Sequence, residues 1–300
     1  MSTLQTTKKS KEAYSVAFQG EIGAYSQSAI YAFFGKDEVS RIVPLPTLRQ
    51  VFESIAFKRE KIEENANCAV VPIENSLAGT IGETLDLLLS SEARIIGEVS
   101  IPISHALISR KASSIDKISK VISHPQAIAQ CKIYLDSKGW QQISVYDTAG
   151  AAKMIKDDSL DDTAAIASEL AAEIYGLKVL ENKIQDDQSN STRFIVIESK
   201  LKGNGIPYDG SLDSKNYKTS VIFSTKHEPG SLVAALSAFS ARGINLTKIE
   251  SRPIKTRPWE YYFFLDFEGH ETNNVCREAL RSLDDHATET KVLGSYKRRV

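Results

Sequence analysis

Short apolar runs and segments with helical spacing of apolar residues alternate along the first two thirds of the 300-residue chain. The alternating pattern predicts strands at 15–19, 41–45 and 68–74 and helices at 24–35, 48–60 and 80–92. Two β-type runs joined by a proline fill 94–110, and strand-then-helix units return at 120–139, 143–158 and 163–176. This order predicts an α/β fold of two lobes joined by crossover strands, with a ligand cleft between them.

The last third of the chain has a different pattern. Residues 199–217 are polar, rich in Gly and Ser, and aperiodic, which predicts a linker after a first domain at 14–198. Residues 1–13 are a predicted flexible tail. Residues 218–297 then give strand, helix, strand, strand, helix and strand, which is the ferredoxin-like βαββαβ pattern.

Composition excludes several classes of protein. The net charge of -1, from 37 basic and 38 acidic residues, gives no global attraction to nucleic acid or to an anionic membrane. No apolar run approaches the ~20 residues that span a bilayer, and the first residues do not resemble a secretory signal. The three cysteines are far apart in the sequence, so we expect a reducing, cytoplasmic compartment. The five histidines show no ligand spacing with Cys or acidic residues, so we expect no structural or catalytic transition metal.

Two motifs of the predicted first lobe offer polar groups at strand ends. In VAFQGEIGAYSQSA (16–29), loop amides and a helix start could hold a carboxylate beside Tyr25 or Ser26, although a plain tight turn fits equally well. The G-x-x-G spacing is not the dinucleotide fingerprint. In VVPIENSLAGTIGET (70–84), Glu74, Asn75 and Ser76 follow a buried strand, where α/β sheets bind ligands, but a solvated turn with a helix cap explains them equally well.

Two further motifs belong to the predicted second lobe. In VISHPQAIAQC (121–131), Ser123 ends a strand, and Gln126 and Gln130 lie one helical turn apart, so both could face the cleft. The segment lacks the G-x-S-x-G pattern of a serine nucleophile. YDTAGAAKM (146–154) places Thr148 at another strand-to-helix junction. In both segments, ordinary helix caps are the alternative.

Polar residues lead directly into an apolar strand in QDDQSNSTRFIVIE (185–198). A hydroxyl at Thr192 beside the guanidinium of Arg193 could donate a hydrogen bond to an oxygen while the cation holds an anion. The alternative is a structural Arg193 paired with Asp186 or Asp187. In the last domain, the helix start at Gly230 and the strand end at Glu250–Arg252 could hold an amino acid, or they could serve only turns.

Together the motifs resemble prephenate dehydratase followed by an ACT domain. GAYS (23–26), PIENS (72–76), SHPQAIAQC (123–131), DTA (147–149) and STRF (191–194) resemble that family's motifs in the family's order. GSLV (230–233) and ESRP (250–253) resemble the two phenylalanine-binding motifs of its regulatory domain. The resemblance covers roughly residues 14–297.

The resemblance implies a two-lobed catalytic domain like that of type II periplasmic binding proteins. It implies a lyase that converts prephenate to phenylpyruvate by decarboxylating dehydration, in phenylalanine biosynthesis. That reaction requires no metal and no organic cofactor, so we expect no cofactor. The catalytic positions it implies are Thr192, Arg193, Glu74, Asn75, Ser123 and Gln130. The substrate-binding positions are Ala24, Tyr25, Ser26, Ser76, Thr148 and Phe194.

The resemblance also implies feedback regulation by L-phenylalanine. The effector positions are Gly230, Ser231, Leu232, Val233, Glu250, Ser251, Arg252 and Pro253. ACT domains pair between subunits, so we expect a homodimer or homotetramer. The first strand begins near Ser15, so we expect no chorismate mutase domain and a monofunctional enzyme.

Two other functions are compatible with the same sequence. Arogenate dehydratase acts on the aminated substrate and shares the motifs, so the sequence does not decide between the two substrates. A non-enzymatic solute-binding protein would use the same two-lobed fold. We expect it less, because such a protein has no use for an ACT domain.

Overall fold

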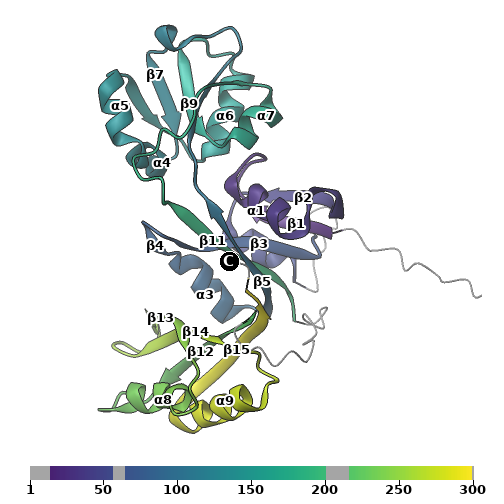
Figure 1. The fold of residues 1–300 in the computed structure, drawn as a ribbon, viewed down its shortest axis with the longest axis vertical. Helices are drawn as coiled ribbons and strands as arrows, with labels where there is room; N and C mark the ends of the chain where they lie inside the picture. Colours follow the sequence, from purple (N-terminus) through teal and green to yellow (C-terminus); the bar gives the residue numbers. More distant parts are fainter. Residues whose placement is uncertain (1–13, 57–64, 201–215, 299–300) are drawn as a thin grey trace, which may run out of the picture.

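The computed structural model describes residues 14–56, 65–200 and 216–298. Three sheets follow one another along the long axis of the molecule, and each forms the centre of one unit (Figure 1). The first lobe lies in the middle, the second lobe at one end and the C-terminal domain at the other. The first lobe therefore contacts both of the other units.

The first lobe is built on a sheet of strand order β2-β1-β3-β11-β5, with β4 paired to β3. Its strands are β1 (Tyr14–Gln19), β2 (Val39–Leu45), β3 (Cys68–Asn75), β4 (Gly79–Thr80), β5 (Ala93–Pro102) and β11 (Ser191–Ser199). Its helices are α1 (Tyr25–Phe34), α2 (Leu48–Ser54) and α3 (Gly82–Ser90). β11 lies antiparallel between β3 and β5, although it comes about 90 residues after β5 in the chain.

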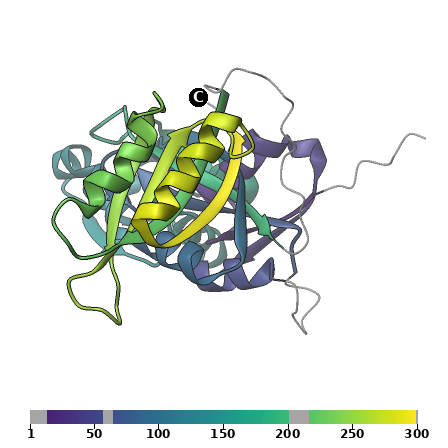
Figure 2. The same cartoon turned by 90° about the horizontal axis from the view of Figure 1, so that it is seen from below.

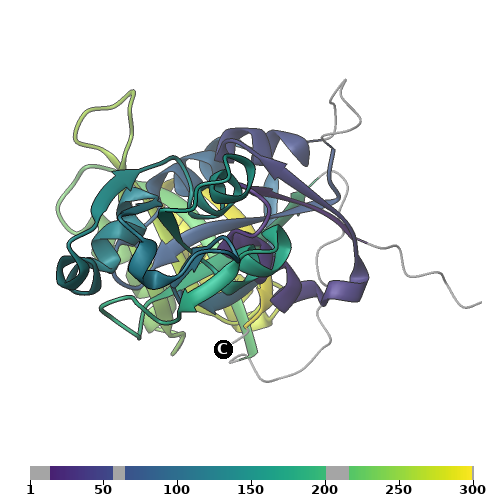
Figure 3. The same cartoon turned by 90° about the horizontal axis from the view of Figure 1, so that it is seen from above.

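The second lobe has a sheet of order β10-β6-β9-β7-β8. Its strands are β6 (Ala106–Ser109), β7 (Lys120–Ser123), β8 (Gln141–Ser144), β9 (Thr163–Ala167) and β10 (Lys178–Glu181). Its helices are α4 (Pro125–Gln130), α5 (Lys132–Lys138), α6 (Thr148–Asp157) and α7 (Glu169–Tyr175). Figure 3 shows these helices gathered around the end of the molecule. The chain enters this lobe after β5 and leaves it before β11, so two crossovers join the lobes.

The predicted elements and the observed ones differ in a few places. The helix predicted at 80–92 begins only at Gly82, because Gly79 and Thr80 pair with β3 as the short strand β4. The helix predicted within 120–139 is divided at Cys131, whose ψ of 23° interrupts the helical backbone. The four-residue strand β10 was not predicted, since no apolar run marks it. The helix predicted at 48–60 ends at Ser54. Residues 57–60 of that prediction lie outside the described residues.

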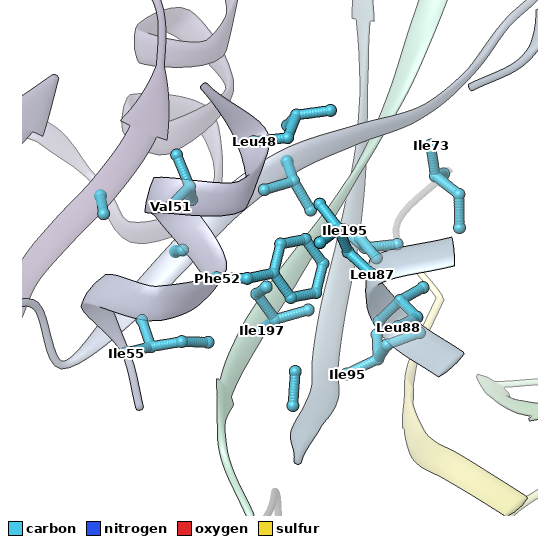
Figure 4. Close-up of a cluster of buried hydrophobic side chains, with 14 of the residues drawn as sticks. Leu48, Val51, Phe52, Ile55, Ile73, Leu87, Leu88, Ile95, Ile195 and Ile197 are labelled. Atoms are coloured by element: carbon cyan, nitrogen blue, oxygen red, sulfur yellow. The ribbon is translucent and has the colours of Figure 1, made fainter. Parts of the chain in front are cut away.

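The main core of the first lobe lies between its sheet and helices α2 and α3. Figure 4 shows Phe52 of α2 and Leu88 of α3 among Ile73, Ile95 and Ile197 of three strands. Phe52 is 5% exposed and Leu88 is fully buried. Burial of a side chain of this size stabilises the fold by about 1.5–3 kcal/mol. This core holds β3 and β11 rigidly side by side, up to the ends where the site residues lie.

The C-terminal domain has the predicted βαββαβ order. Its elements are β12 (Tyr217–Thr225), α8 (Ser231–Ser240), β13 (Leu246–Pro253), β14 (Tyr261–Glu268), α9 (Asn274–His286) and β15 (Ala287–Lys297), in a sheet of order β13-β14-β12-β15. Both helices cover one face of this sheet (Figure 2). The other face packs on the first lobe, where Ile222 and Phe264 join the same core as Leu85 and Ile95. The C-terminal domain is thus an integral neighbour of the first lobe.

The predicted linker and tail are largely outside the described part of the chain. Of the predicted linker at 199–217, residues 201–215 are not described, and neither is the tail at 1–13. The domain boundaries therefore stay predictions. Among the described residues, no helix combines the length and the apolar character needed to cross a membrane.

Candidate active site

Two adjoining cavities lie between the lobes, with volumes of about 410 and 130 Å³. Residues of both lobes line both of them: Tyr25, Asn75, His124, Gln126, Thr148 and Thr192. Asn75 ends β3 and Thr192 begins β11, while Thr148 starts α6 of the second lobe. The cavities therefore form one cleft at the place where the sequence pattern predicts a ligand.

Asn75 and Thr192 are opposite each other in the register of β3 and β11. The Asn75 Oδ1 atom accepts hydrogen bonds from the backbone N–H groups of Leu77 and Ala78, at 3.1 and 2.9 Å. These bonds fix the orientation of the amide, so its Nδ2 group must face β11. Nδ2 donates to Thr192 Oγ1 at 3.0 Å and to the Asn190 side chain at 2.8 Å.

The hydroxyl of Thr192 is thereby oriented. Its oxygen accepts a hydrogen bond from Asn75, so the hydroxyl proton is left to donate elsewhere. In the part of the chain that the structure describes, no acceptor is recorded for that proton. Thr192 is 8% exposed and lines both cavities, so its hydroxyl is available to donate to a ligand within the cleft.

A second hydrogen-bonded group joins the two lobes in the smaller cavity. The Tyr25 hydroxyl lies 2.7 Å from the Ser104 carbonyl oxygen and 2.9 Å from His105 Nδ1, and His105 Nε2 lies 2.9 Å from Gln130 Oε1. His105 is 2% exposed, and burial lowers its pKa, which favours a neutral imidazole. Burial also raises the pKa of Tyr25, so its phenol stays protonated. This group is therefore uncharged and fixed.

The loop between β1 and α1 ties the first lobe to the second. The Ser168 hydroxyl donates to the Gly23 carbonyl at 2.7 Å, and the Tyr175 hydroxyl donates to the Ile22 carbonyl at 2.8 Å. Gly23 has a φ of +95°, and a Cβ atom there would lie 2.9 Å from the Cα atom of Ala171. This close approach of the two lobes requires glycine.

The charge of the cleft is small and negative. Asp147 is the one Asp, Glu, Lys or Arg among the described residues that line it, and its side chain accepts a hydrogen bond from Gly150 N at 2.8 Å. Burial raises the pKa of Asp147. The N-termini of α1 and α6 also open into the cleft, and helix N-termini favour bound anions. Within residues 14–56, 65–200 and 216–298, no cluster of His, Cys, Asp and Glu side chains could hold a metal ion.

Comparison with known families assigns both parts of the chain. The family described as prephenate dehydratase matches residues 16–202, and the ACT domain family matches residues 219–285. The chain belongs to the prephenate dehydratase family. The two-lobed α/β fold with a C-terminal ACT domain, predicted from the sequence, is thereby confirmed.

The names of similar proteins give two activities, prephenate dehydratase and arogenate dehydratase. The chain is 42% identical to "Arogenate dehydratase/prephenate dehydratase 2, chloroplastic" of Arabidopsis thaliana, over 94% of this chain and 72% of the relative. It is 39% identical to the prephenate dehydratase of Methanocaldococcus jannaschii, over 91% of this chain and 94% of the relative. A solved structure of prephenate dehydratase from Arthrobacter aurescens, in complex with L-Phe, matches with a TM-score of 0.82 and 30% identity, over 95% of this chain and 90% of that one.

The cleft contains eight of the twelve residues that were predicted to be catalytic or substrate-binding. They are Asn75, Thr192, Tyr25 and Thr148 in both cavities, Gln130 and Phe194 in the smaller, and Ala24 and Ser26 in the larger. Their common position supports the prediction but does not test their roles, which stay predictions.

Glu74 and Arg193 lie on the other face of the sheet, and the prediction that placed them in the cleft needs correction. Successive residues of a strand point to opposite faces, so β3 and β11 send Asn75 and Thr192 into the cleft and their neighbours toward the ACT domain. Arg193 Nη2 lies 2.8 Å from the Asp266 carboxylate, and Glu74 pairs with Lys248 at 3.1 Å. The alternative prediction paired Arg193 with Asp186 or Asp187. Among the described residues, its ion pairs are instead with Glu74, Glu98 and Asp266.

Ser123 and Ser76 lie outside the cleft, and their hydroxyls form hydrogen bonds with the backbone. Ser123 is fully buried, and its hydroxyl donates to the Ile166 carbonyl at 2.6 Å, so it joins β7 to β9 instead of lining the cleft. The Ser76 hydroxyl accepts a hydrogen bond from Ser191 N at 3.0 Å and fixes the start of β11. Neither residue lines a cavity of the cleft.

His105 is one of the cleft residues that sequence reasoning missed. His105 lies in none of the motifs that resemble the family, and it shows no metal-ligand spacing. The available signal is its position shortly after Pro102 and Ile103, where the chain passes between the lobes.

The predicted effector residues of the ACT domain divide between two faces of its sheet. Glu250 pairs in register with Phe264, which faces the first lobe, and it accepts a hydrogen bond from Thr80 at 3.0 Å. Arg252 contacts Asp86 of α3 at 3.2 Å. Ser251 faces the opposite side, on which α8 begins at Ser231. Within one chain, Glu250 and Arg252 therefore point away from the Gly230–Val233 segment.

Proposed function

We propose that this protein is a prephenate dehydratase that forms phenylpyruvate and is inhibited by L-phenylalanine. The observation that supports this most directly is the Thr192 hydroxyl, whose oxygen is held by Asn75 and whose proton is left for a ligand in the cleft. The family membership supports the same reaction.

The chemistry needs few protein groups. Loss of carbon dioxide from one carbon and of the hydroxyl group from the opposite carbon aromatises the ring, so the substrate supplies the driving force. The enzyme must hold the substrate, orient it and donate a hydrogen bond where negative charge develops on the departing oxygen. Thr192 is the proposed donor. A threonine hydroxyl is a very weak acid, so it acts as a hydrogen-bond donor or relay and not as a free acid.

Substrate carboxylates would be held without a cationic side chain. No lysine or arginine is among the described residues that line the cleft. The N-terminus of α1 and the hydroxyl of Thr148 are the donors available, because the Tyr25 hydroxyl already donates to the Ser104 carbonyl and the Asp147 side chain caps α6. The near-neutral total charge of the chain agrees with recognition by local donors.

The second candidate function is arogenate dehydratase, and one observation favours it. Arogenate carries an ammonium group in place of the keto oxygen, and Asp147 is the one charged side chain among the described cleft residues. A carboxylate in a cleft without cations suits a substrate that bears a positive group. The relatives named arogenate dehydratase support this candidate as well.

A side-by-side assay separates the two candidates. The purified full chain is given prephenate, with phenylpyruvate measured, and arogenate, with phenylalanine measured. The proposal expects the higher kcat/KM with prephenate. A higher value with arogenate would establish the second candidate, and no turnover of either would overturn both.

Effector binding and assembly are part of the same proposal. Phenylalanine would bind at the segments 230–233 and 250–253, which do not converge within one chain. Val233 is 69% exposed and Ile249 of β13 is 47% exposed, which fits an effector site completed by a second copy in a homodimer or homotetramer. Isothermal titration with phenylalanine and light scattering test the two parts. A cytoplasmic location stays a prediction.

A further inference from the structure

Asn190 is a buried side chain next to the site, yet it lines neither cavity. It is 1% exposed and directly precedes β11, at the end of the second crossover. Its backbone carbonyl accepts a hydrogen bond from Ile103 N at 2.9 Å, which ties together the two chain segments that cross between the lobes. The motifs considered in the sequence assign no role to this residue.

The side chain of Asn190 holds the amide of Asn75. Asn190 Oδ1 accepts from Asn75 Nδ2 at 2.8 Å, which is shorter than the bonds from the same nitrogen to Thr192 Oγ1 at 3.0 Å and to the Ser191 carbonyl at 3.1 Å. Asn75 Nδ2 has two N–H groups for these three acceptors. Asn190 therefore takes one of the two N–H groups, which leaves the other for Thr192 Oγ1 and the Ser191 carbonyl.

The nitrogen of the same amide, Asn190 Nδ2, has a different environment from the oxygen. In the described part of the protein, Asn190 Nδ2 is buried and has no hydrogen-bond partner. A buried donor without a partner destabilises a folded protein. The oxygen Oδ1, which accepts from Asn75, is therefore the atom of this side chain that has a hydrogen-bond partner among the described residues.

We propose that Asn190 is a positioning residue for the dehydration reaction, acting through Asn75 on Thr192. With Asn190 in place, Asn75 donates to Thr192 Oγ1, which keeps the hydroxyl proton directed at the cleft and makes it a better donor. This inference rests on the proposed function, because it assigns Asn190 a role in the step that Thr192 assists.

The test uses the full chain and begins with the wild-type protein, for which turnover of prephenate or arogenate must be seen. Asn190→Leu removes the acceptor and should lower kcat about tenfold, the equivalent of one neutral hydrogen bond, with little change in KM. Asn190→Asp keeps an oxygen toward Asn75 and should restore kcat to within about threefold of the wild type. Asn67→Leu applies the same change far from the cleft and serves as a control, because Asn67 precedes β3, is exposed, and accepts a hydrogen bond from Ser15 N.

Two further measurements separate positioning from a structural effect. In an Asn75→Ala background, Asn190→Leu should lower kcat no further, since its effect passes through Asn75. Melting temperatures report the fold, and Asn190→Ala replaces Asn190→Leu if the larger side chain prevents folding. A normal kcat in the folded Leu or Ala variant, an Asp variant as slow as the Leu variant, or additive losses in the double variant would each overturn the proposal. Lack of turnover by the wild type would instead overturn the proposed function.

Discussion

The guanidinium of Arg193 lies 2.8 Å from the carboxylate of Asp266, so the residue beside Thr192 is bound to the ACT domain. Glu98 and Lys218 complete this buried group, with Lys218 Nζ 2.8 Å from Glu98 and Arg193 Nη1 3.7 Å from it. Burial is the largest single influence and opposes a charged Arg193, but Asp266, Tyr296 and Glu98 together outweigh it and raise the pKa of Arg193 above its usual value. One strand thus carries both a cleft residue and a residue of the domain junction.

Replacement of Asp266 by asparagine should destabilise the protein strongly. The change leaves Arg193 buried without its closest carboxylate, and breaking such a pair costs about 3–5 kcal/mol. Urea unfolding measures the loss. Glu268→Gln on the same strand is the control, because the Glu268–Arg298 pair is more exposed and should contribute less than about 1 kcal/mol. Equal losses in the two variants would refute the importance of the buried group.

Lys248→Met should weaken inhibition by phenylalanine while catalysis continues. Lys248 Nζ donates to Thr80 Oγ1 at 2.9 Å and pairs with Glu74 at 3.1 Å, so it links the predicted effector strand to the wall of the cleft. Allosteric coupling is typically ~1–3 kcal/mol, and part of it would be lost. The ratio of the uninhibited rate to the fully inhibited rate should then fall, by about fivefold for each 1 kcal/mol lost. Steady-state kinetics with phenylalanine, together with titration of its binding, measure the effect.

The control for this variant is Lys255→Met. Lys255 also joins the ACT domain to the first lobe, through Asp86 at 3.3 Å, but its side chain is 83% exposed. Its loss should leave inhibition nearly unchanged. Full inhibition of the Lys248→Met protein would show that the signal takes another route.

Thr192→Val should lower kcat by a factor of about 10²–10³, because it replaces the one hydroxyl that Asn75 directs into the cleft by a methyl group. Thr192→Ser keeps the hydroxyl and should retain most of the activity. Single-turnover kinetics with either substrate provide the measurement. The role of Thr192 would have to be abandoned if the valine protein turned over normally.

Gly23→Ala should separate the lobes and lower kcat/KM. The new Cβ atom would lie 2.9 Å from the Cα atom of Ala171, and the backbone has a φ of +95°. Gly176→Ala isolates the backbone part of the effect, since Gly176 has a φ of +67° and no atom within 4 Å of an added Cβ. At similar melting temperatures, only the Gly23 variant should lose activity by about tenfold or more. Equal kinetics in both variants would argue against the contact between the lobes.

Acid should destabilise the protein in part through His105. Burial lowers the pKa of His105 in the folded state, so the unfolded chain binds the proton first as the pH falls. The contribution of His105 is fully present above its usual pKa of about 6.5 and is lost as the pH falls below that value toward the folded pKa. His105→Gln should therefore show a shallower fall in the free energy of unfolding between about pH 7 and 5. Parallel curves for the two proteins would contradict this.

The sequence predicted the order of elements well, because the period of the apolar residues reports directly which backbone form can bury them. It placed Thr192 and Arg193 together, although adjacent strand residues must face opposite sides. The partner of Arg193 could not be identified, since Asp266 is 73 residues away and belongs to another domain. Similarly, the hydroxyl of Ser123 looked available at a strand end, but β9 arrives beside it only in the folded lobe and supplies the Ile166 carbonyl.

Because β11 lies between β3 and β5, the sheet of the first lobe cannot be completed until residue 199 has been synthesised. A nascent chain that has emerged to residue 190 has β1 to β5 but lacks the strand that joins β3 to β5, whereas the sheet of the second lobe is already complete by residue 181. Local contacts form faster than contacts between distant segments. The order of synthesis therefore favours a protein whose middle unit folds after the lobe that follows it in the chain, with Thr192 among the last residues of the cleft to be placed.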